Sequence, residues 1–157
     1  MPQLLSEDTY TISFLSKAYR KGKLSPVQVT EHYLDAISRL DPRLGAYQDI
    51  WSKSALDMAL AAERALSSGY NLGPFHGIPF ALKDIFHVKG RVSTCGSAAM
   101  VDHVADQTSI VVSRLIEAGG IILGKTKTVE CAFGGWGTNQ KMGTPQNPWD
   151  MNTHRVP

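Results

Sequence analysis

The sequence has only two cysteines, Cys95 and Cys131, and they lack the spacing of a metal site or of a disulfide framework. Disulfides persist mainly in oxidising compartments, so a chain this poor in cysteine is expected in a reducing one. The five histidines are scattered, without the i, i+4 pairing or the cysteine partners of a zinc site. We therefore expect a cytoplasmic protein with no metal and no other cofactor, in which Cys131 is a small buried side chain.

Long apolar segments and an excess of one charge sign are also missing. No apolar run approaches the roughly 20 residues that a membrane-spanning helix requires. The first ten residues carry Glu7 and Asp8 rather than the basic start of a secretory signal. The 16 basic and 14 acidic residues give a net charge of +2 and are spread along the chain. We therefore expect neither a membrane nor a nucleic acid as a partner.

What is present is the composition of a globular domain, with 43% hydrophobic and 19% charged residues in a chain of 157. Apolar residues recur at helical spacing before Gly22, which predicts a first helix. The sequence from Ser25 to Gln28 spells a capping box with proline at the first helical position. We expect this second helix to end at Asp41-Pro42. A short extended piece over 44–51 and an alanine-rich helix over 52–68 follow.

After Asn71 the pattern changes to alternating strands and helices. An apolar strand ends at Lys83, Asp106 is expected to cap a helix through residues 110–118, and a second buried strand covers 121–125. Strand, helix and strand in this order predict a right-handed crossover and parallel pairing, hence an α/β sheet with helices on its faces. The predicted organisation is one domain, with an N-terminal helical layer over 1–70 and the start of an α/β core over 71–157.

Lys83 is the first candidate for chemistry, because it ends a short apolar strand that reads as largely buried. Burial disfavours the charged form of a lysine and lowers its pKa, which is how a lysine becomes a base near neutral pH. The alternative is a lysine that reaches into solvent, as most lysines at strand ends do. The neighbouring Asp84 either caps the next turn or positions Lys83, and the usual preference of aspartate favours the cap.

The segment Gly119 to Thr126 matches the written pattern of a phosphate-binding loop. That loop must lie between a strand and a helix so that its backbone N–H groups can surround the phosphates. Here the interior residues Ile121 to Leu123 are strand-like, and the residues before Gly119 indicate a helix. We therefore do not expect nucleotide binding.

A glycine-rich stretch surrounds Trp136 and predicts a loop whose backbone approaches another group closely. The alternative is a tight turn with a packed indole ring.

Several short motifs occur together in a fixed order. They are Gly77-Ile78-Pro79, Lys83-Asp84, Gly96-Ser97, Leu115-x-x-Ala118-Gly119, Gly124-Lys125-Thr126, Glu130-x-Ala132 and Asn147-Pro148-Trp149-Asp150. In this order and at these spacings, the chain resembles the N-terminal part of an amidase signature enzyme. The resemblance covers residues 70–157 in detail and implies a mixed sheet flanked by helices, with an N-terminal helical layer.

The resemblance implies a Ser-cisSer-Lys triad and an acyl-enzyme formed from an amide substrate. The lysine of that triad transfers onto Lys83. Both serines belong to Gly/Ser-rich segments that follow the Asn-Pro-Trp-Asp motif in the family, and neither is carried over to this chain, because the candidates do not occupy the motif positions. Those candidates are Ser93, Ser97, Ser109 and Ser113.

The chain stops at Val156-Pro157, where the resemblance places the start of the Gly/Ser-rich segment. We therefore expect an incomplete fragment that is inactive alone, has unpaired sheet edges, and binds the remainder of an amidase chain. Homo-oligomer formation stays open.

The loop of Phe133, Gly134, Gly135 and Trp136 passes near the acyl pocket in the family, so these residues are the predicted substrate-binding residues. They differ from the Met-Gly-Ser-Ser-Thr loop of the glutaminyl-tRNA-forming amidotransferase. A tryptophan here narrows the pocket, which favours a hydrolase of small-molecule amides. The A subunit of that tRNA-dependent amidotransferase and a non-catalytic interaction module are the alternatives. The sequence does not identify the amide.

Overall fold

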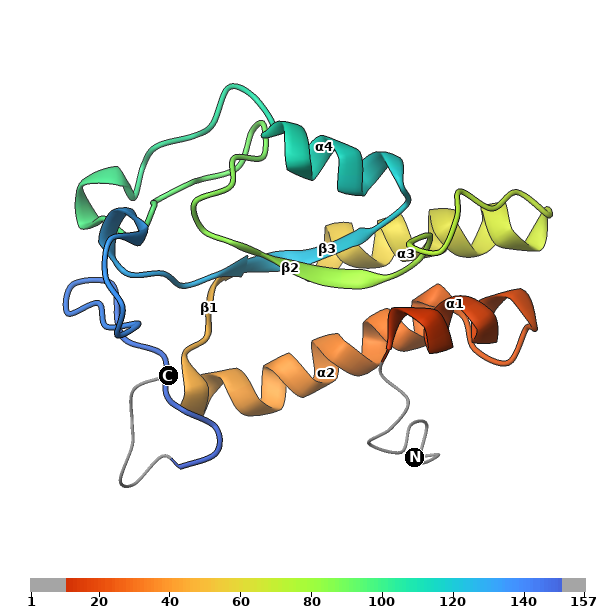
Figure 1. Cartoon of the computed structure of the whole chain (residues 1–157), viewed down its shortest axis with the longest axis horizontal. Helices are drawn as coiled ribbons and strands as arrows, with labels where there is room; N and C mark the ends of the chain where they lie inside the picture. The colour runs from red at the N-terminus through yellow and green to blue at the C-terminus, as the bar shows by residue number, and fades with distance from the viewer. Residues whose placement is uncertain (1–10, 151–157) are drawn as a thin grey trace.

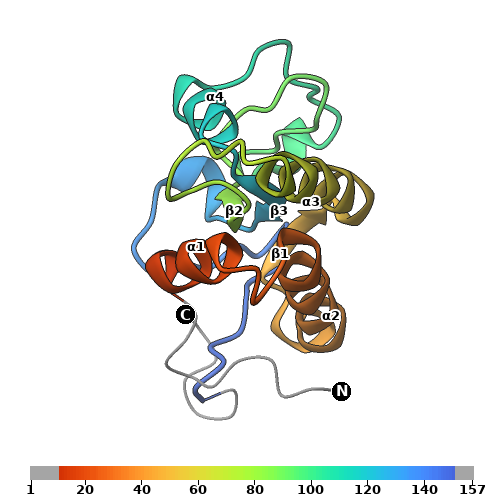
Figure 2. The ribbon, with the colours of Figure 1, turned by 90° about the vertical axis from the view of Figure 1, so that its right-hand side faces the viewer.

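The computed structural model describes residues 11–150 of the chain. The chain end at Val156-Pro157 and the rest of the ranges 1–10 and 151–157 lie outside the described residues. The central sheet lies between α4 on one side and α1 and α2 on the other (Figures 1 and 2). In chain order the elements are α1 (Ile12–Arg20), α2 (Pro26–Leu44), β1 (Tyr47–Ile50), α3 (Ser52–Ser67), β2 (Pro79–Lys83), the short 3-10 helix η2 (Ala98–Met100), α4 (Ile110–Glu117), β3 (Ile121–Thr126) and the 3-10 helix η3 (Glu130–Ala132).

The sheet has the strand order β1-β3-β2, with β3 in the centre. β2 pairs with β3 in parallel, and β1 pairs with β3 in the antiparallel direction. The predicted parallel pairing around a crossover helix is therefore confirmed, and the sheet is mixed. β1 comes from the segment predicted as the helical layer, so that segment and the α/β segment share one sheet.

The helices of the first 70 residues follow the sequence pattern closely. The capping box is formed, because the Ser25 hydroxyl accepts a hydrogen bond from the Gln28 N–H at 3.2 Å and the Gln28 side chain accepts one from the Ser25 N–H at 3.0 Å. The predicted end of α2 at Asp41-Pro42 is wrong. Pro42 lies in the last turn, where its fixed φ suits a helix and few hydrogen bonds remain to be lost. The helix ends one turn later at Gly45, whose φ of 60° is left-handed.

Helix α4 begins later than its predicted cap. Ser109, not Asp106, occupies the N-cap position, and its hydroxyl accepts a hydrogen bond from the His87 N–H at 2.9 Å. The serine therefore ties the start of α4 to the segment after β2.

Within residues 11–150 the core consists of three apolar clusters that hold the helices to the sheet. One joins α2 and α3 to β3, and its buried members are Ile37, Ala55, Ala59, Ile121 and Leu123. A second joins α1 and α2 to the start of β2 through Leu15, Tyr19, Val29 and Ile78. The third joins α4 to the other face of the sheet through Trp51, Leu82, Val112 and Ile122. Successive residues of β3 thus serve opposite faces, as the alternation of a strand requires.

This alternation is interrupted once, at Gly124. The register of β2 on β3 passes from Phe80 opposite Ile122 to Ala81 opposite Gly124, so β3 has one extra residue at this point. Gly124 has a φ of +156°, and a Cβ atom there would lie 2.2 Å from the Asp49 carbonyl oxygen of β1. Only glycine allows β1 to come this close. As a result, Lys125 pairs with Leu82 and points to the α4 side of the sheet.

Replacing Gly124 with alanine tests the bulge. We expect Gly124→Ala to lower the free energy of unfolding by roughly 2–3 kcal/mol, because the new methyl group meets backbone atoms and the φ angle is strained. Urea denaturation of a protein containing this chain would measure the loss. Gly135→Ala is the matched control, since a Cβ there has nothing within 4 Å. Equal stabilities of the two variants would contradict the close approach.

Candidate active site

β2 delivers Lys83 to the carboxyl end of the sheet, with its side chain exposed. The prediction of a largely buried strand is wrong, because only Leu82 of the five residues is buried and Ala81 is exposed with Lys83. The two exposed residues alternate with Leu82 and lie on the other face of an edge strand. The burial expected for the Lys83 ammonium is therefore not provided by residues 11–150.

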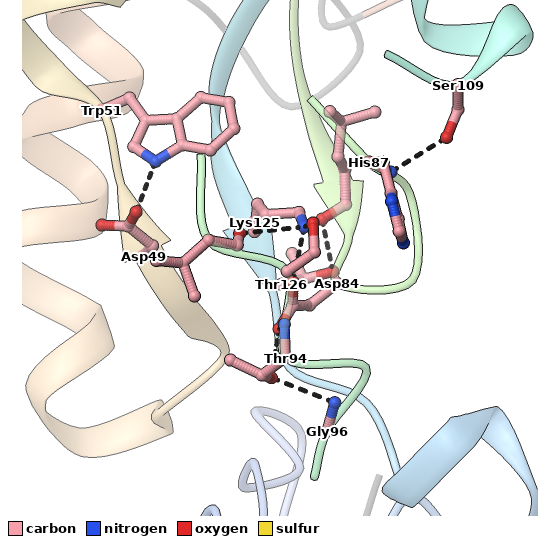
Figure 3. A network of polar contacts seen from close by, with 12 residues as sticks. Asp49, Trp51, Asp84, His87, Thr94, Gly96, Ser109, Lys125 and Thr126 are labelled. Carbon is pink, nitrogen blue, oxygen red and sulfur yellow. Dashed lines mark hydrogen bonds and ion pairs between the residues drawn. The ribbon is translucent and has the colours of Figure 1, made fainter. Parts of the chain in front are cut away.

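A different lysine, Lys125 of β3, is buried at this end of the sheet (Figure 3). Its ammonium forms an ion pair with Asp84, with 2.6 Å between Nζ and Oδ1, and each side chain is 1% exposed. It also donates to the Ser93 hydroxyl at 2.7 Å and to the Val92 carbonyl at 3.4 Å. Burying a charge is costly unless it is both paired and hydrogen-bonded, and Lys125 meets both conditions.

The carboxylate of Asp84 is shared between two neighbours. While Oδ1 faces Lys125, Oδ2 accepts hydrogen bonds from the N–H of Thr94 at 3.2 Å and from its hydroxyl. The preferred interpretation of Asp84 as the cap of the next turn is therefore wrong. Asp84 points to the same side as Leu82, into the layer beneath α4, where a buried cation replaces solvent as its partner.

Lys125 and Ser93 are close enough to suggest a serine–lysine pair for catalysis. Two features exclude it. A base must be uncharged, and the Lys125 ammonium is committed to the Asp84 carboxylate. Ser93 is 0% exposed, so no amide could reach its hydroxyl. Lys125 lies in β3, directly after α4 and Gly119-Gly120, so the context required of a phosphate-binding loop is absent as predicted.

The segment from Ser93 to Ser97 links the ion pair to the loop that follows β3. Beyond Ser93 and Thr94, the Ser97 hydroxyl donates to a Glu130 carboxylate oxygen at 2.7 Å. The backbone of Gly96 runs so close to the next segment that a Cβ atom would lie 2.6 Å from the Thr128 carbonyl oxygen. The loop after β3 is therefore fixed to the same segment as Asp84.

Asn139 is the second attachment of that loop. Its buried amide donates to the carbonyls of Gly96 at 2.6 Å and Thr128 at 3.0 Å. The side-chain oxygen accepts from the N–H groups of Lys141 at 3.2 Å and Met142 at 2.9 Å. One side chain thus satisfies four backbone groups and fixes both sides of the glycine-rich loop.

The predicted substrate-binding residues lie between these attachments. Phe133 is 94% exposed and Trp136 is 79% exposed, so the alternative of a packed indole does not describe this loop. Gly134 lies against Val129, and Gly135 has open space around it. In Figure 1 this loop lies beyond the carboxyl ends of β2 and β3, the side from which Lys83 also leaves the sheet. Ligands of open α/β sheets bind at this end.

The two cysteines are neighbours in this region, since the N–H of Cys131 donates to the Cys95 carbonyl at 2.7 Å. The prediction that Cys131 is buried is wrong, because η3 turns it outward and it is exposed. Burial raises the pKa of the Cys95 thiol, and the nearby Asp84 carboxylate raises it further. A reactive thiolate at Cys95 is therefore disfavoured.

Two further serines, Ser97 and Ser109, and the buried His76 at the opposite end of the strands have structural partners. Ser109 accepts from the backbone after β2, and Ser97 is paired with Glu130. His76 is buried and accepts a hydrogen bond from the Leu72 N–H at 3.2 Å, and burial lowers its pKa. Between residues 11 and 150, no group of three His, Cys, Asp or Glu side chains is placed to hold a metal ion. None of the helices in that range is long and apolar enough to cross a bilayer.

Sequence reasoning missed Lys125 and Asn139. A signal for Lys125 was present, because two opposite charges, Asp84 and Lys125, end neighbouring apolar strands and parallel pairing brings such ends together. Asn139 had no comparable signal. The two carbonyls to which its amide donates lie 11 and 43 residues away in sequence.

The fold is of the α/β class, with a mixed sheet and an N-terminal helical layer. The family model described as Amidase matches residues 28–157. The chain belongs to the amidase family.

Relatives in this family have several activities. The chain is 38% identical over 138 residues to a 2-amino-5-chloromuconic acid deaminase of Comamonas testosteroni, covering 88% of this chain and 30% of the relative. It is also 38% identical over 147 residues to the A subunit of the glutamyl-tRNA(Gln) amidotransferase of Dehalococcoides mccartyi, covering 94% of this chain and 30% of that protein. The chain therefore spans about a third of the length of these relatives.

Solved structures share the fold. A native peptide amidase from Stenotrophomonas maltophilia superposes with a TM-score of 0.83 at 30% identity, over 94% of this chain and 31% of that one. A bacterial aryl acylamidase of the amidase signature family gives a TM-score of 0.85 at 25% identity, over 95% and 31% of the two chains.

Replacing Asn139 with alanine tests the attachment of the loop. We expect faster hydrogen exchange at the amides of Lys141 and Met142 and a loss of about 2 kcal/mol of stability, because four backbone groups lose their partner. Hydrogen-exchange mass spectrometry and urea denaturation would measure both. Asn71→Ala is the control, since Asn71 makes its one hydrogen bond, to the Gly73 N–H, at the surface. Unchanged exchange over 139–144 in the Asn139 variant would contradict this role.

Proposed function

We propose that this chain supplies the N-terminal part of an amide hydrolase in which Lys83 is the base of a Ser-cisSer-Lys triad. The observation that carries the proposal is the position of Lys83, which leaves the carboxyl end of a parallel strand directly beside a buried, charge-neutral Lys125–Asp84 pair. Membership of the amidase family supports the reaction class, and amidases with the same fold support it further.

In the proposed mechanism the uncharged Lys83 amine accepts a proton from the cis-serine, which accepts one from the nucleophilic serine. The nucleophile attacks the amide carbonyl, the leaving amine takes a proton back, and water then hydrolyses the acyl-enzyme. Both serines come from sequence beyond this chain. That remainder would also cover Lys83, whose side chain is exposed among residues 11–150, and would pair with the open edge of β2.

The loop of Phe133, Gly134, Gly135 and Trp136 is proposed to contact the acyl group of a small-molecule amide. Support comes from two exposed aromatic rings on a loop that is fixed at both sides by Asn139. A cytoplasmic location is part of the proposal and rests on the use of cysteine alone.

The A subunit of a tRNA-dependent amidotransferase is the second candidate, because a protein of that kind is 38% identical to this chain. The glycine and tryptophan composition of the loop favours the hydrolase. An amidotransferase would require partner proteins and a tRNA-bound acyl group for its activity, and this requirement would distinguish it from the hydrolase. A non-catalytic interaction module would show no amide turnover in any protein that contains the chain.

Replacing Lys83 with alanine tests the base. In the amide-hydrolysing protein that contains this chain, we expect Lys83→Ala to lower kcat at least about 10,000-fold, because the lysine acts as one unit with the nucleophile. Circular dichroism should be unchanged, because the Lys83 side chain belongs to none of the three core clusters and alanine keeps the backbone hydrogen bonds of the turn. Lys89→Ala is the control, an exposed lysine in the following turn. Turnover retained in the Lys83 variant would eliminate the triad assignment.

Replacing Trp136 with glycine tests the acyl pocket. We expect Trp136→Gly to change the ratio of kcat/KM between large and small acyl groups by about 10-fold, because a large ring no longer limits the space. A panel of amides with one leaving amine and increasing acyl size would measure it. Trp149→Gly serves as the comparison, since Trp149 is 94% exposed on a segment outside the loop. Identical profiles for the parent and the Trp136 variant would count against the assignment.

A further inference from the structure

Lys83 is held in place from the opposite face of the sheet. Leu82 and Asp84 point toward α4, whereas Lys83 projects from the other side of β2. The Asp84 N–H continues the parallel ladder by donating to the Thr126 carbonyl at 2.9 Å. The Lys83 carbonyl then accepts from the N–H groups of Ile85 at 2.8 Å and Phe86 at 3.1 Å. The backbone of Lys83 thus lies between the last ladder bond and a tight turn.

The side chain of Asp84 is the anchor for that turn. It forms an ion pair with the Lys125 ammonium of β3 and accepts hydrogen bonds from the N–H and the hydroxyl of Thr94. The Lys125 ammonium also donates hydrogen bonds to the Ser93 hydroxyl and the Val92 carbonyl. Because both side chains are 1% exposed, water cannot replace a missing partner without a rearrangement of the backbone.

We propose that Lys125 is a positioning residue for Lys83, acting through the Asp84 carboxylate and the turn at Lys83–Phe86. Lys125 touches no substrate. It fixes the direction in which the Lys83 side chain leaves the sheet, and a catalytic group must be held within a fraction of an ångström of its working position. This inference rests on the proposed function only for its catalytic consequence. The effect on the turn is independent of any activity.

Two variants test the inference in the protein that contains this chain. Lys125→Met leaves the Asp84 carboxylate buried without its cation, which can unfold the protein. The double variant Lys125→Met/Asp84→Asn removes both charges, keeps the approximate volume, and leaves an amide oxygen for Thr94, so we expect it to fold. Lys53→Met is the matched control, because Lys53 pairs with Asp57 at 2.7 Å on the exposed face of α3.

The first measurement is hydrogen exchange resolved to single amides. In the double variant we expect the amides of Asp84, Ile85 and Phe86 to exchange at least about 10-fold faster, while amides inside α3 keep their parental rates. A purely structural role would accelerate both sets together. Parental exchange at residues 84–86 in a folded double variant would overturn the inference, as would an increase of equal size in α3.

The second measurement is amide turnover. We expect kcat of the double variant to fall at least about 10-fold with KM changed less than about 3-fold, since the groups that contact substrate are retained. An unchanged kcat together with faster exchange at 84–86 would overturn the catalytic consequence. If Lys83→Ala retains turnover, the proposed function fails, and the exchange measurement still decides whether Lys125 fixes the turn.

Discussion

The ion pair between Lys125 and Asp84 is the constraint on which the rest of this region depends. Two charges removed from water are stable only if every strong hydrogen-bonding direction is filled. Here the groups come from three places in the chain: the residue after β2, the carboxyl end of β3, and the segment from Val92 to Thr94. The bulge at Gly124 turns Lys125 to the α4 side, where these groups meet. The pair therefore specifies how strands and loops meet, beyond any contribution it makes to stability.

The segment Ser93–Ser97 connects the buried ion pair to the loop that follows β3. One end is bound to the ion pair, and the other approaches Thr128 and is bound to Glu130 and Asn139. The exposed aromatic loop and the exposed Lys83 are therefore both attached to the buried Lys125–Asp84 pair. This arrangement separates two tasks, because the groups proposed to meet substrate are exposed while the groups that hold them are inaccessible.

Much of the fold was predictable from the sequence because local signals and tertiary structure agree. The capping box at Ser25, the alanine-rich α3 and the apolar β3 each carry their own pattern. The end of α2 was not predictable from Pro42 alone. The Asp41 carboxylate accepts hydrogen bonds from the N–H groups of Ala46 and Tyr47, which stabilises the turn that follows the end of the helix at Leu44. Lys83 was a candidate from its motif and its strand, whereas the partner of Asp84 depended on a register that the bulge shifts by one residue.

Gly124 has a consequence for insertions and deletions in this chain. Removing the extra residue would restore strict alternation and exchange the faces of everything after it in β3, so the ammonium of Lys125 would enter the layer of Ala55 and Ala59. A loss of one codon here is thus equivalent to placing an unpaired charge in the helical core. Length changes should be confined to surface connections such as residues 68–71 between α3 and β2, where the chain is exposed and lies outside the strands.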